Sequence, residues 1–335
     1  SGREFSAIVG IANNDTSGGK VGEATQDANH VNLSKVLMRV NSPTNMFDYS
    51  AGYNRAEVSR AGVRALRAED IINHYGSGIW TWDFDWLVDN EKGIQNLLEL
   101  MYPNHGGTIT TSMTYPAAPT VNDLSHGETA ESVSKLAFII LQNPLATRDH
   151  YMHSANLQEL TLSMSATADG GRLRASGQFM SGYKPIIENN SIGADTGEAD
   201  YAKGLFDCTT STFGGDAAIV RDFSLTISNP ASRVGWQGTG GETDGYSRGG
   251  AFSITGSITM KSDSLQQIND DTFWKANTTA ALVLGQGTNI DFNLPAVNVS
   301  NISYDMAEEG IFQTVDFTAT SGADAGGNLA VIKAT

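Results

Sequence analysis

The stretch LTLSMSATADGGRLRASGQFMSG, residues 160–182, limits the fold of this 335-residue chain more than any other feature. Apolar residues from Leu160 to Met164 alternate with Ser and Thr, and the alternation resumes from Leu173 to Phe179. Ala-Asp-Gly-Gly, a sequence typical of turns, separates the two runs. Because successive side chains of a strand point to opposite faces, the stretch predicts a β-hairpin with one apolar and one polar face.

Two further hairpins are predicted from the same alternation. The second pairs RDFSLTISN, residues 221–229, with GAFSITGSITMKS, residues 250–262. The third covers residues 297–322, with a turn near Glu-Glu-Gly and a change of parity between Val299 and Ile302 that indicates a β-bulge. A hairpin type recurs here without a strict sequence repeat, so a solenoid is not expected.

The most aromatic stretch, IWTWDFDW at residues 79–86, also predicts a strand. Its apolar face is formed by Trp80, Trp82, Phe84 and Trp86. Burial of this face in the core is the favoured interpretation. In a sugar-binding alternative the tryptophans would stack on a carbohydrate, and Asp83 and Asp85 would act as acid and base. Carboxylates along one strand are only a weak indication of such a site, because the two groups must converge across a substrate.

A short amphipathic helix is predicted directly after the aromatic strand, in DNEKGIQNLLELMYP. Asp89 or Asn90 can cap its first turn, and Pro103 ends it. Its apolar residues follow the helical spacing i, i+3, i+4 and i+7: Ile94, Leu97, Leu98 and Met101. The helix is therefore expected to lie across an otherwise β core.

The remaining segments complete the prediction of a single domain over residues 1–335. Further strands are expected at 4–12, 33–40 and 135–142. The core is assigned to residues 76–182 and 221–322, with long acidic, Gly-rich loops or insertions at 183–220 and 230–249 and an N-terminal arm at 13–30.

Composition excludes several classes of function. The chain has 37 Asp and Glu against 21 Lys and Arg, a formal net charge of −16, so it is not expected to seek nucleic acid. Cys208 is the only cysteine, which rules out an intrachain disulfide and favours a reducing compartment. The N-terminus does not read as a signal peptide, and no apolar run approaches the length of a membrane span.

Residues 54–73 permit either a helix or an extended form. In a helix Arg60, Arg64 and Arg67 would line one face. Such a basic stripe could bind phosphate, but a solvated face or a subunit contact is favoured in so acidic a chain.

A search for chemistry predicts no catalytic, cofactor-binding or metal-binding residues. His150 and His153 could lie close together on a helix, but a third ligand at zinc-site spacing is missing, so surface or subunit-contact histidines are favoured. Cys208 is interpreted as a small buried side chain rather than a nucleophile. The segment from Asp195 to Asp200 departs from the spacing of a calcium loop.

The outward faces of the predicted hairpins point to self-assembly. They are rich in Ser and Thr and nearly free of lysine, as in Ser224, Thr226 and Ser228. Exposed strand edges ordinarily carry lysine or proline that prevents pairing with other chains. Edges with so little protection favour a β protein that pairs with copies of itself.

The order of these elements resembles the tail tube (major tail) proteins of long-tailed bacteriophages. The matching pieces span residues 76–322: GSGIWTWDFDWLVDNEKGIQNLLELMYPN, LQELTLSMSATADGGRLRASGQFMSG, DFSLTISNPAS, GGAFSITGSITMKSD and LPAVNVSNISYDMAEEGIFQTVDFTATSG. The resemblance implies a mainly β fold, two packed antiparallel sheets in a sandwich or barrel with a flanking α-helix.

It also implies a structural virion protein without catalysis. Six copies would form a ring, and stacked rings would form a hollow tail tube, assembled in the host cytoplasm without a membrane anchor. The implied partners are further copies, a tape-measure protein in the lumen, terminator and baseplate or distal tail proteins at the ends, a sheath in contractile tails, and double-stranded DNA in transit without specific binding.

Two alternatives stay open from the sequence. One is a tail hub or terminator on the same fold, and the other is a β-sandwich carbohydrate hydrolase or binding module. In the tube interpretation, Arg172 and Arg174 are expected to point to a subunit contact or to the outside rather than into the channel.

Overall fold

The structure is a computed structural model in which seventeen segments are described. These are residues 6–12, 35–38, 46–49, 53–57, 68–75, 79–101, 112–116, 136–142, 148–188, 201–233, 236–237, 242–243, 246–248, 252–262, 278–285, 290–320 and 328–334. The predicted N-terminal arm at 13–30, the arginines Arg60, Arg64 and Arg67, and the segment from Asp195 to Asp200 lie outside the described residues.

Most of the described chain belongs to one antiparallel hydrogen-bonded network of sixteen strands. Its strands are β1 (Ser6–Ala12), β2 (Lys35–Met38), β5 (Trp80–Leu87), β6 (Ser112–Pro116), β7 (Leu136–Gln142), β8 (Asp149–Ser165), β9 (Arg174–Ser181), β10 (Ile186–Glu188), β11 (Ser211–Phe213), β12 (Asp216–Ala217), β13 (Val220–Ser228), β18 (Ser253–Lys261), β19 (Ala280–Leu284), β20 (Ile290–Ala307), β21 (Gly310–Ala319) and β22 (Asn328–Ala334). The main path runs β12-β11-β19-β20-β21-β18-β13-β8-β7-β1-β2.

Smaller elements complete the description. Three two-stranded sheets pair β3 (Tyr53–Glu57) with β4 (Ile71–Tyr75), β14 (Ala231–Arg233) with β17 (Tyr246–Arg248), and β15 (Trp236–Gln237) with β16 (Glu242–Thr243). Short 3-10 turns are η2 (Ala68–Asp70), η4 (Asp169–Gly171) and η5 (Leu205–Asp207), and α2 (Glu91–Met101) is the one α-helix among the described residues. This confirms the mainly β, antiparallel fold with a helix.

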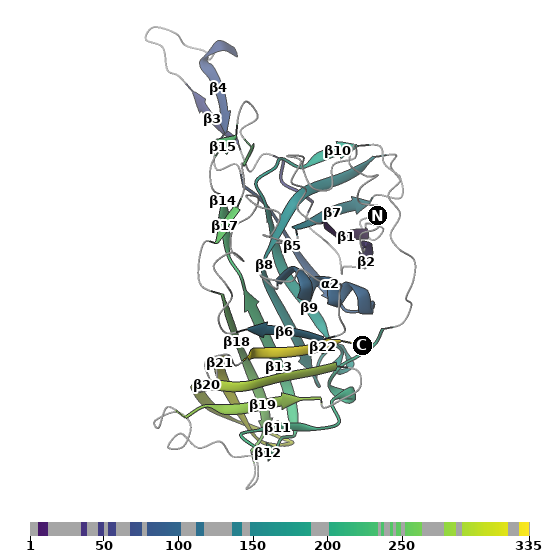
Figure 1. Ribbon diagram of the computed structural model, residues 1–335, viewed down its shortest axis with the longest axis vertical. Coiled ribbons are helices and arrows are strands. Elements are labelled where there is room, and N and C mark those ends of the chain that lie inside the picture. Colours follow the sequence, from purple (N-terminus) through teal and green to yellow (C-terminus); the bar gives the residue numbers. More distant parts are fainter. Residues whose placement is uncertain are drawn as a thin grey trace.

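Two long strands fold the network over itself. The first part of β8 pairs with β7 and β10, and its second part pairs with β9 and β13. Likewise, β20 pairs first with β19 and β22 and then with β21. In Figure 1 the strands β6, β22 and β19 run across the steeper strands β13, β18 and β21. Phe292 of β20 meets Phe223 of β13 with ring centroids 5.0 Å apart, so the two layers pack face to face.

The aromatic strand β5 supplies much of the core. Its burial alternates as the sequence predicts: the three tryptophans and Phe84 are at most 3% exposed, whereas Thr81, Asp83 and Asp85 are exposed. Trp82 stacks on Phe179 of the neighbouring strand β9, at a centroid distance of 6.0 Å. The apolar face of the sheet therefore begins at this edge and continues across the molecule.

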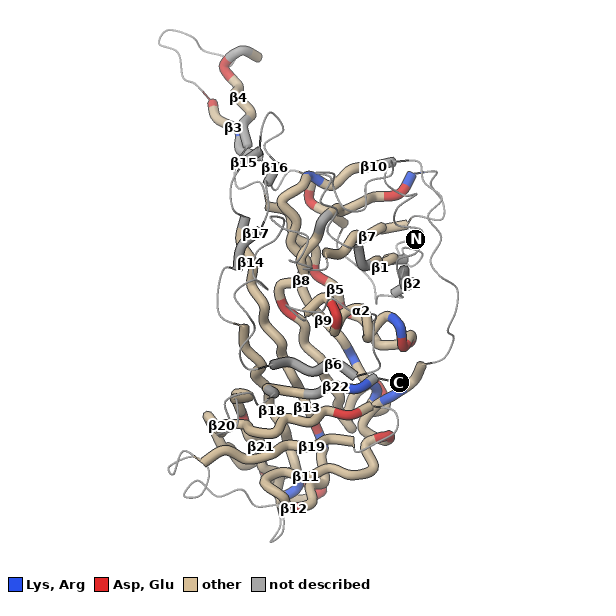
Figure 2. Tube along the Cα trace, viewed as in Figure 1, with Lys and Arg blue, Asp and Glu red and all other residues tan. Residues whose placement is uncertain are grey.

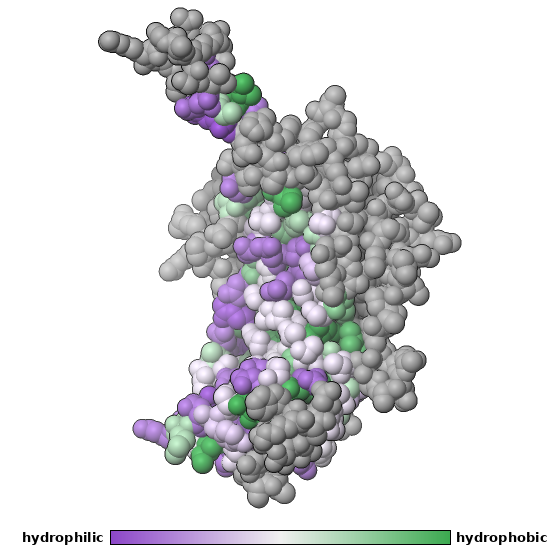
Figure 3. All heavy atoms as spheres, turned by 90° about the vertical axis from the view of Figure 1, so that its left-hand side faces the viewer, coloured by the Kyte–Doolittle hydropathy of each residue, from purple (hydrophilic) through white to green (hydrophobic). Residues whose placement is uncertain are grey.

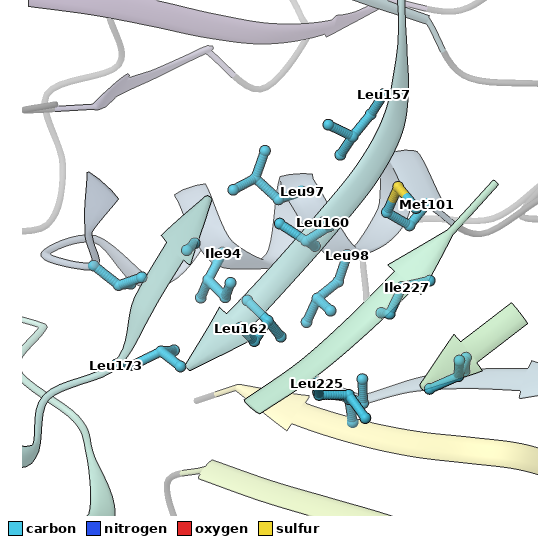
Figure 4. Close-up of a cluster of buried hydrophobic side chains, with 14 of the residues drawn as sticks. Ile94, Leu97, Leu98, Met101, Leu157, Leu160, Leu162, Leu173, Leu225 and Ile227 are labelled. Carbon is cyan, nitrogen blue, oxygen red and sulfur yellow. The ribbon is translucent and has the colours of Figure 1, made fainter. Parts of the chain in front are cut away.

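Helix α2 covers that face where β8 crosses it. The backbone N–H of Gly93 donates to the side chain of Asn90 over 3.2 Å, which confirms Asn90 as a cap. The predicted apolar residues of the helix lie against β8 residues such as Leu157 and Leu160 (Figure 4). Gln95, Asn96 and Glu99 are also buried, so the polar side of the helix is covered as well, which the amphipathic pattern did not indicate.

The three predicted hairpins are present. In the first, η4 forms the turn between β8 and β9, and Asp169, Gly170 and Gly171 all have positive φ, the region in which glycine is least strained. The second pairs β13 with β18 in full register between residues 222 and 228. The third pairs β20 with β21 and carries its bulge between Val299 and Asn301, as the parity change predicted.

The two long intervals contain more regular structure than loops have, and the stretch left open between helix and strand is extended where the structure describes it. The intervals 183–220 and 230–249, predicted as long loops or insertions, contain short elements: β10, η5, β11, β12 and the start of β13 in the first, and β14 to β17 in the second. Alternation is too short in these two- and three-residue strands to be seen in the sequence. The ambiguous stretch 54–73 is extended at both of its described ends, in β3 and β4, with η2 before β4.

Replacing Trp82 with alanine tests the role of the aromatic strand. Trp82→Ala removes a side chain that is 2% exposed and packs against Phe47, Phe84 and Phe179. We expect the free energy of unfolding to fall by about 3–5 kcal/mol, measured by urea denaturation. Thr81→Ala, on the exposed face of the same strand, is the matched control and should change it by no more than about 0.5 kcal/mol. Equal losses in the two variants would contradict this assignment of the faces.

Candidate functional site

The face of the sheet opposite the core carries polar side chains aligned in cross-strand rows. The strands concerned follow one another as β5-β9-β8-β13-β18-β21-β20. Because these strands are in antiparallel register, residues of the same parity face one another across the whole sheet. We call this surface the polar wall, and its rows are defined by the strand register.

Four rows make up the polar wall. The first contains Asp83, Gln178, Glu159, Ser228 and Ser253; the second contains Asp85, Ser176, Thr161, Thr226, Thr255, Thr318 and Asn298; the third contains Arg174, Ser163, Ser224, Ser257, Asp316 and Asn301; the fourth contains Ser165, Asp222, Thr259, Thr314 and Ser303.

Hydroxyl groups dominate these rows, and they hydrogen-bond across the strands. The hydroxyls of Thr161 and Thr226 are 2.9 Å apart, as are those of Thr259 and Thr314. These hydroxyl groups thus satisfy one another without formal charge, whereas the side-chain amides of Gln178 and Asn301 donate to Asp83 and Asp316. Figure 3 shows pale and purple atoms across the middle of the side of the molecule that it displays.

The charge of the polar wall is acidic. The four rows contain five carboxylates, Asp83, Asp85, Glu159, Asp222 and Asp316, against the single guanidinium of Arg174. Beyond the fourth row the same face continues with Lys261, Phe312 and Asp305, so an exposed lysine lies at the end of the polar wall. In Figure 2 the central strands of this sheet are drawn mostly in tan, with few charged residues. A surface of this kind offers a polyanion almost nothing to bind.

Arg174 does not act as a free cation on the polar wall. It donates two hydrogen bonds of 2.6 Å to the two carboxylate oxygens of Asp85 and a third of 2.7 Å to Asp169. The hydrogen bond to Asp85 is the main cause that raises the pKa of Arg174 above its usual value. The guanidinium therefore stays charged but is neutralised in place by two carboxylates.

Arg172 lies apart from the polar wall. It donates to the backbone carbonyl of Val88 over 3.1 Å. Its neighbour two residues on, Arg174, shares the face of the hydroxyl rows. Both arginines were expected at a subunit contact or on the outside. In the structure Arg172 binds the backbone at Val88, whereas Arg174 lies in the third row of the polar wall.

The residues considered for sugar chemistry do not form a paired site. Trp80 and Trp82 are 1% and 2% exposed, which removes the aromatic platform that a carbohydrate-binding module needs. Asp83 accepts a hydrogen bond of 2.7 Å from Gln178 and borders an open depression with Glu159, whereas Asp85 is engaged by Arg174. Asp83 and Asp85 therefore do not converge across one cleft.

The two histidines lie on strand β8 rather than on a helix. His150 shares a 2.5 Å hydrogen bond with the hydroxyl of Tyr49, and burial lowers the pKa of the imidazole. His153 is fully buried and stacks on Tyr151, so the expectation of a surface histidine is wrong for this residue. Among the residues that the structure describes, no group of three His, Cys, Asp or Glu side chains could hold a metal ion.

Cys208 is half-buried and packs beside the core, which agrees approximately with the prediction of a small buried side chain. Its thiol lies 3.6 Å from the carbonyl oxygen of Gly204. Burial raises the pKa of the Cys208 thiol to about 12, with further contributions from Asp207 and Asp291. Such a thiol is protonated, and hence a poor nucleophile, at neutral pH.

No described helix is long and apolar enough to span a bilayer.

Sequence reasoning identified the hydroxyl faces of the hairpins but not the rows they form. The rows depend on which strands are neighbours and on their register, and neither follows from a single strand. The part played by Arg174 was missed because its partner Asp85 is 89 residues away in the sequence.

The reactivity of Cys208 gives a direct check of this environment. Because the folded state holds the thiol proton more tightly, this group lowers stability as pH rises from about 9 to about 12. At pH 8 we expect a thiol-specific disulfide reagent to react at least about 100-fold more slowly with the native protein than with the urea-unfolded protein. Similar rates in the two states would contradict the buried environment.

Comparison with known proteins adds one match. The family model described as phage tail tube protein matches residues 77–319 of the chain. This interval contains the helix and every strand of the polar wall. No curated protein matches the sequence.

Proposed function

The chain belongs to the phage tail tube protein family, and we propose that six copies form a ring and that the rings stack into the hollow tube through which phage DNA passes. Membership makes it a structural protein of the virion tail that assembles with copies of itself and with other tail proteins. Three points go beyond membership and are proposed here: that the ring has six copies, that the polar wall faces the bore, and that DNA passes through it.

The observation that carries the proposal is the polar wall. It lies on a sheet whose two outer strands, β5 and the second half of β20, each pair on one side only within the described chain. Open edges of this kind present backbone donors and acceptors to another strand. Pairing β5 of one subunit with β20 of the next would continue the rows around a closed ring.

The chemistry of the polar wall suits a conduit for duplex DNA. Cations on such a surface would neutralise phosphates and hold the duplex at every ring. The hydroxyl rows carry five carboxylates, and their one guanidinium is already paired with Asp85 and Asp169. Repeated around a ring, this charge would repel the DNA backbone and leave it free to move.

Arg174 modifies the sequence-based expectation within this proposal. If the polar wall lines the channel, Arg174 lies on it rather than away from it. The two carboxylates that bind it compensate its charge, so Arg174 adds no free cation to the four rows. From the sequence, Arg174 was expected to stay out of the channel. In this proposal it lies on the channel surface, and its ion pairs with Asp85 and Asp169 keep it from attracting DNA.

The proposed role extends to partners and place of assembly. A tape-measure protein would occupy the lumen during assembly in the host cytoplasm, and terminator and baseplate or distal tail proteins would close the ends, with a sheath outside if the tail contracts. No catalysis is proposed. The buried tryptophans and the separate engagements of Asp83 and Asp85 argue against carbohydrate chemistry.

Electron microscopy of the purified, concentrated protein tests the proposal. We expect negatively stained rings with a central hole, or hollow filaments of uniform width, and a matching large species in sedimentation velocity. Rings that never extend at any concentration would favour the hub or terminator alternative. A monomer at every concentration, even after addition of sonicated tail fragments as seeds, would overturn the proposal.

A further inference from the structure

The exposed apolar side chains of the described residues lie outside the four rows of the polar wall. Among the described residues, the large apolar side chains that are exposed are Met46, Ile72, Ile187, Phe206, Ile219, Tyr304, Met306 and Ile311. None of them belongs to the four rows. Three of them, Tyr304, Met306 and Ile311, lie where the hairpin of β20 and β21 turns, and we call this group the tip patch.

The tip patch is an uncovered continuation of the core face. The pair of Met306 with Ile311 lies four residues along each strand from the pair of Ile302 with Val315, so both pairs lie on the same face of the hairpin. Val315 is fully buried, whereas Met306 is 82% exposed. The apolar face of this hairpin therefore extends beyond the part of the core that covers Val315, and its last residues are exposed.

The hairpin holds the tip patch in a defined position. The side-chain amide of Gln313, itself fully buried, donates to the hydroxyl of Tyr304 over 3.0 Å. The backbone N–H of Ser262, directly after β18, donates to the backbone carbonyl of Ile311. Apolar side chains presented on so well-fixed a backbone are typical of a surface that binds another protein.

Acidic groups surround the tip patch. Asp305, Glu308 and Glu309 lie in the same turn of the hairpin and are exposed. Two cations lie nearby: Arg221 is engaged by Asp222 over 2.8 Å and by the ring of Phe312 at 4.3 Å, and Lys261 of β18, which pairs with Phe312, is exposed. The three carboxylates still exceed the one cation that is not engaged by Asp222. A partner surface for this end should thus combine apolar contact with positive charge.

The opposite end of the same sheet meets both requirements. There β10 pairs only with the first residues of β8 within the described chain, and its Ile187 is 46% exposed. Lys184 precedes β10, and the exposed Arg148 precedes β8; of the acidic residues beside them, Asp149 is buried and Glu188 ends β10. Figure 2 accordingly shows red as well as blue segments beside β10. We call Arg148, Lys184 and Ile187 the β10 surface.

The two surfaces lie at opposite ends of the molecule. The β10 surface is at the start of β8, and Ser165 at the other end of that strand shares the fourth row with Ser303 and Thr314, next to the turn of the tip patch. Figure 1 shows β10 near the top and β20 and β21 toward the bottom, and Figure 3 shows green atoms on a projecting segment at the lower end.

We propose that the tip patch of one copy docks against the β10 surface of a second copy in the next ring. The contact joins two different surfaces, so it repeats without closing and extends a filament along the long axis. Acidic groups of the hairpin would face Arg148 and Lys184, and Met306 and Ile311 would cover Ile187. The proposal rests on the proposed function, since it assigns the contact between its rings.

Exposed-site variants of the full chain test the docking. We expect Met306→Ser to form rings normally and to raise the critical concentration for filaments at least about tenfold, measured by sedimentation and negative-stain microscopy. Charge reversal by Glu308→Lys with Glu309→Lys should do the same. Adding Arg148→Glu and Lys184→Glu to that variant should restore filaments, because the opposed charges are again complementary.

Controls separate this proposal from the function on which it rests. Lys92→Glu, an equally drastic charge change on the exposed side of α2, should leave filaments intact. Unchanged filament formation in both Met306→Ser and the hairpin charge reversal, or failure of the four-residue variant to recover, would overturn the docking. Loss of the rings themselves in Met306→Ser would place the tip patch within a ring and also overturn it. A wild-type chain that forms neither rings nor filaments would instead count against the proposed function.

Discussion

The alternation of side chains along extended strands is the constraint on which the rest of the structure depends. A strand that buries Leu160 and Leu162 must present Thr161 and Ser163 on the other side. Seven neighbouring strands in register extend this division over a whole sheet, so one face has to be covered and the other has to meet solvent or a partner. The core and the polar wall are two consequences of one pattern.

Covering the apolar face explains the less regular parts of the fold. Helix α2 packs over β8, and the first half of β20 crosses over β13 through the contact of Phe292 with Phe223. The long strands β8 and β20 make this possible because each leaves one layer and enters another without a break in hydrogen bonding. Where the cover ends, at the turn of β20 and β21, apolar side chains are left exposed, and this is the surface that we propose for docking to a second copy.

Local features were predictable from the sequence, and pairings between distant segments were not. The parity of the tryptophans, the cap at Asn90, the turn at Gly170 and Gly171, and the bulge after Val299 each depend on neighbouring residues, and the structure confirms all of them. The extension of β8 back to Asp149 was missed because the histidine spacing also fits a helix, and tertiary pairing with β7 and β10 decides in favour of a strand. The rows of the polar wall, and the ion pair of Arg174 with Asp85, need the full strand order.

The central claim is that the hydroxyl-rich, acidic face of the sheet lines the bore of the assembled tube. A cryo-electron microscopy reconstruction of the filaments, at a resolution that traces β-strands, tests this claim most directly. We predict that β9, β8, β13, β18 and β21 surround the bore with the side chains of Thr161, Thr226 and Thr255 directed inward and α2 farther from the axis. A reconstruction with these threonines on the outer surface, or with α2 against the bore, would contradict it.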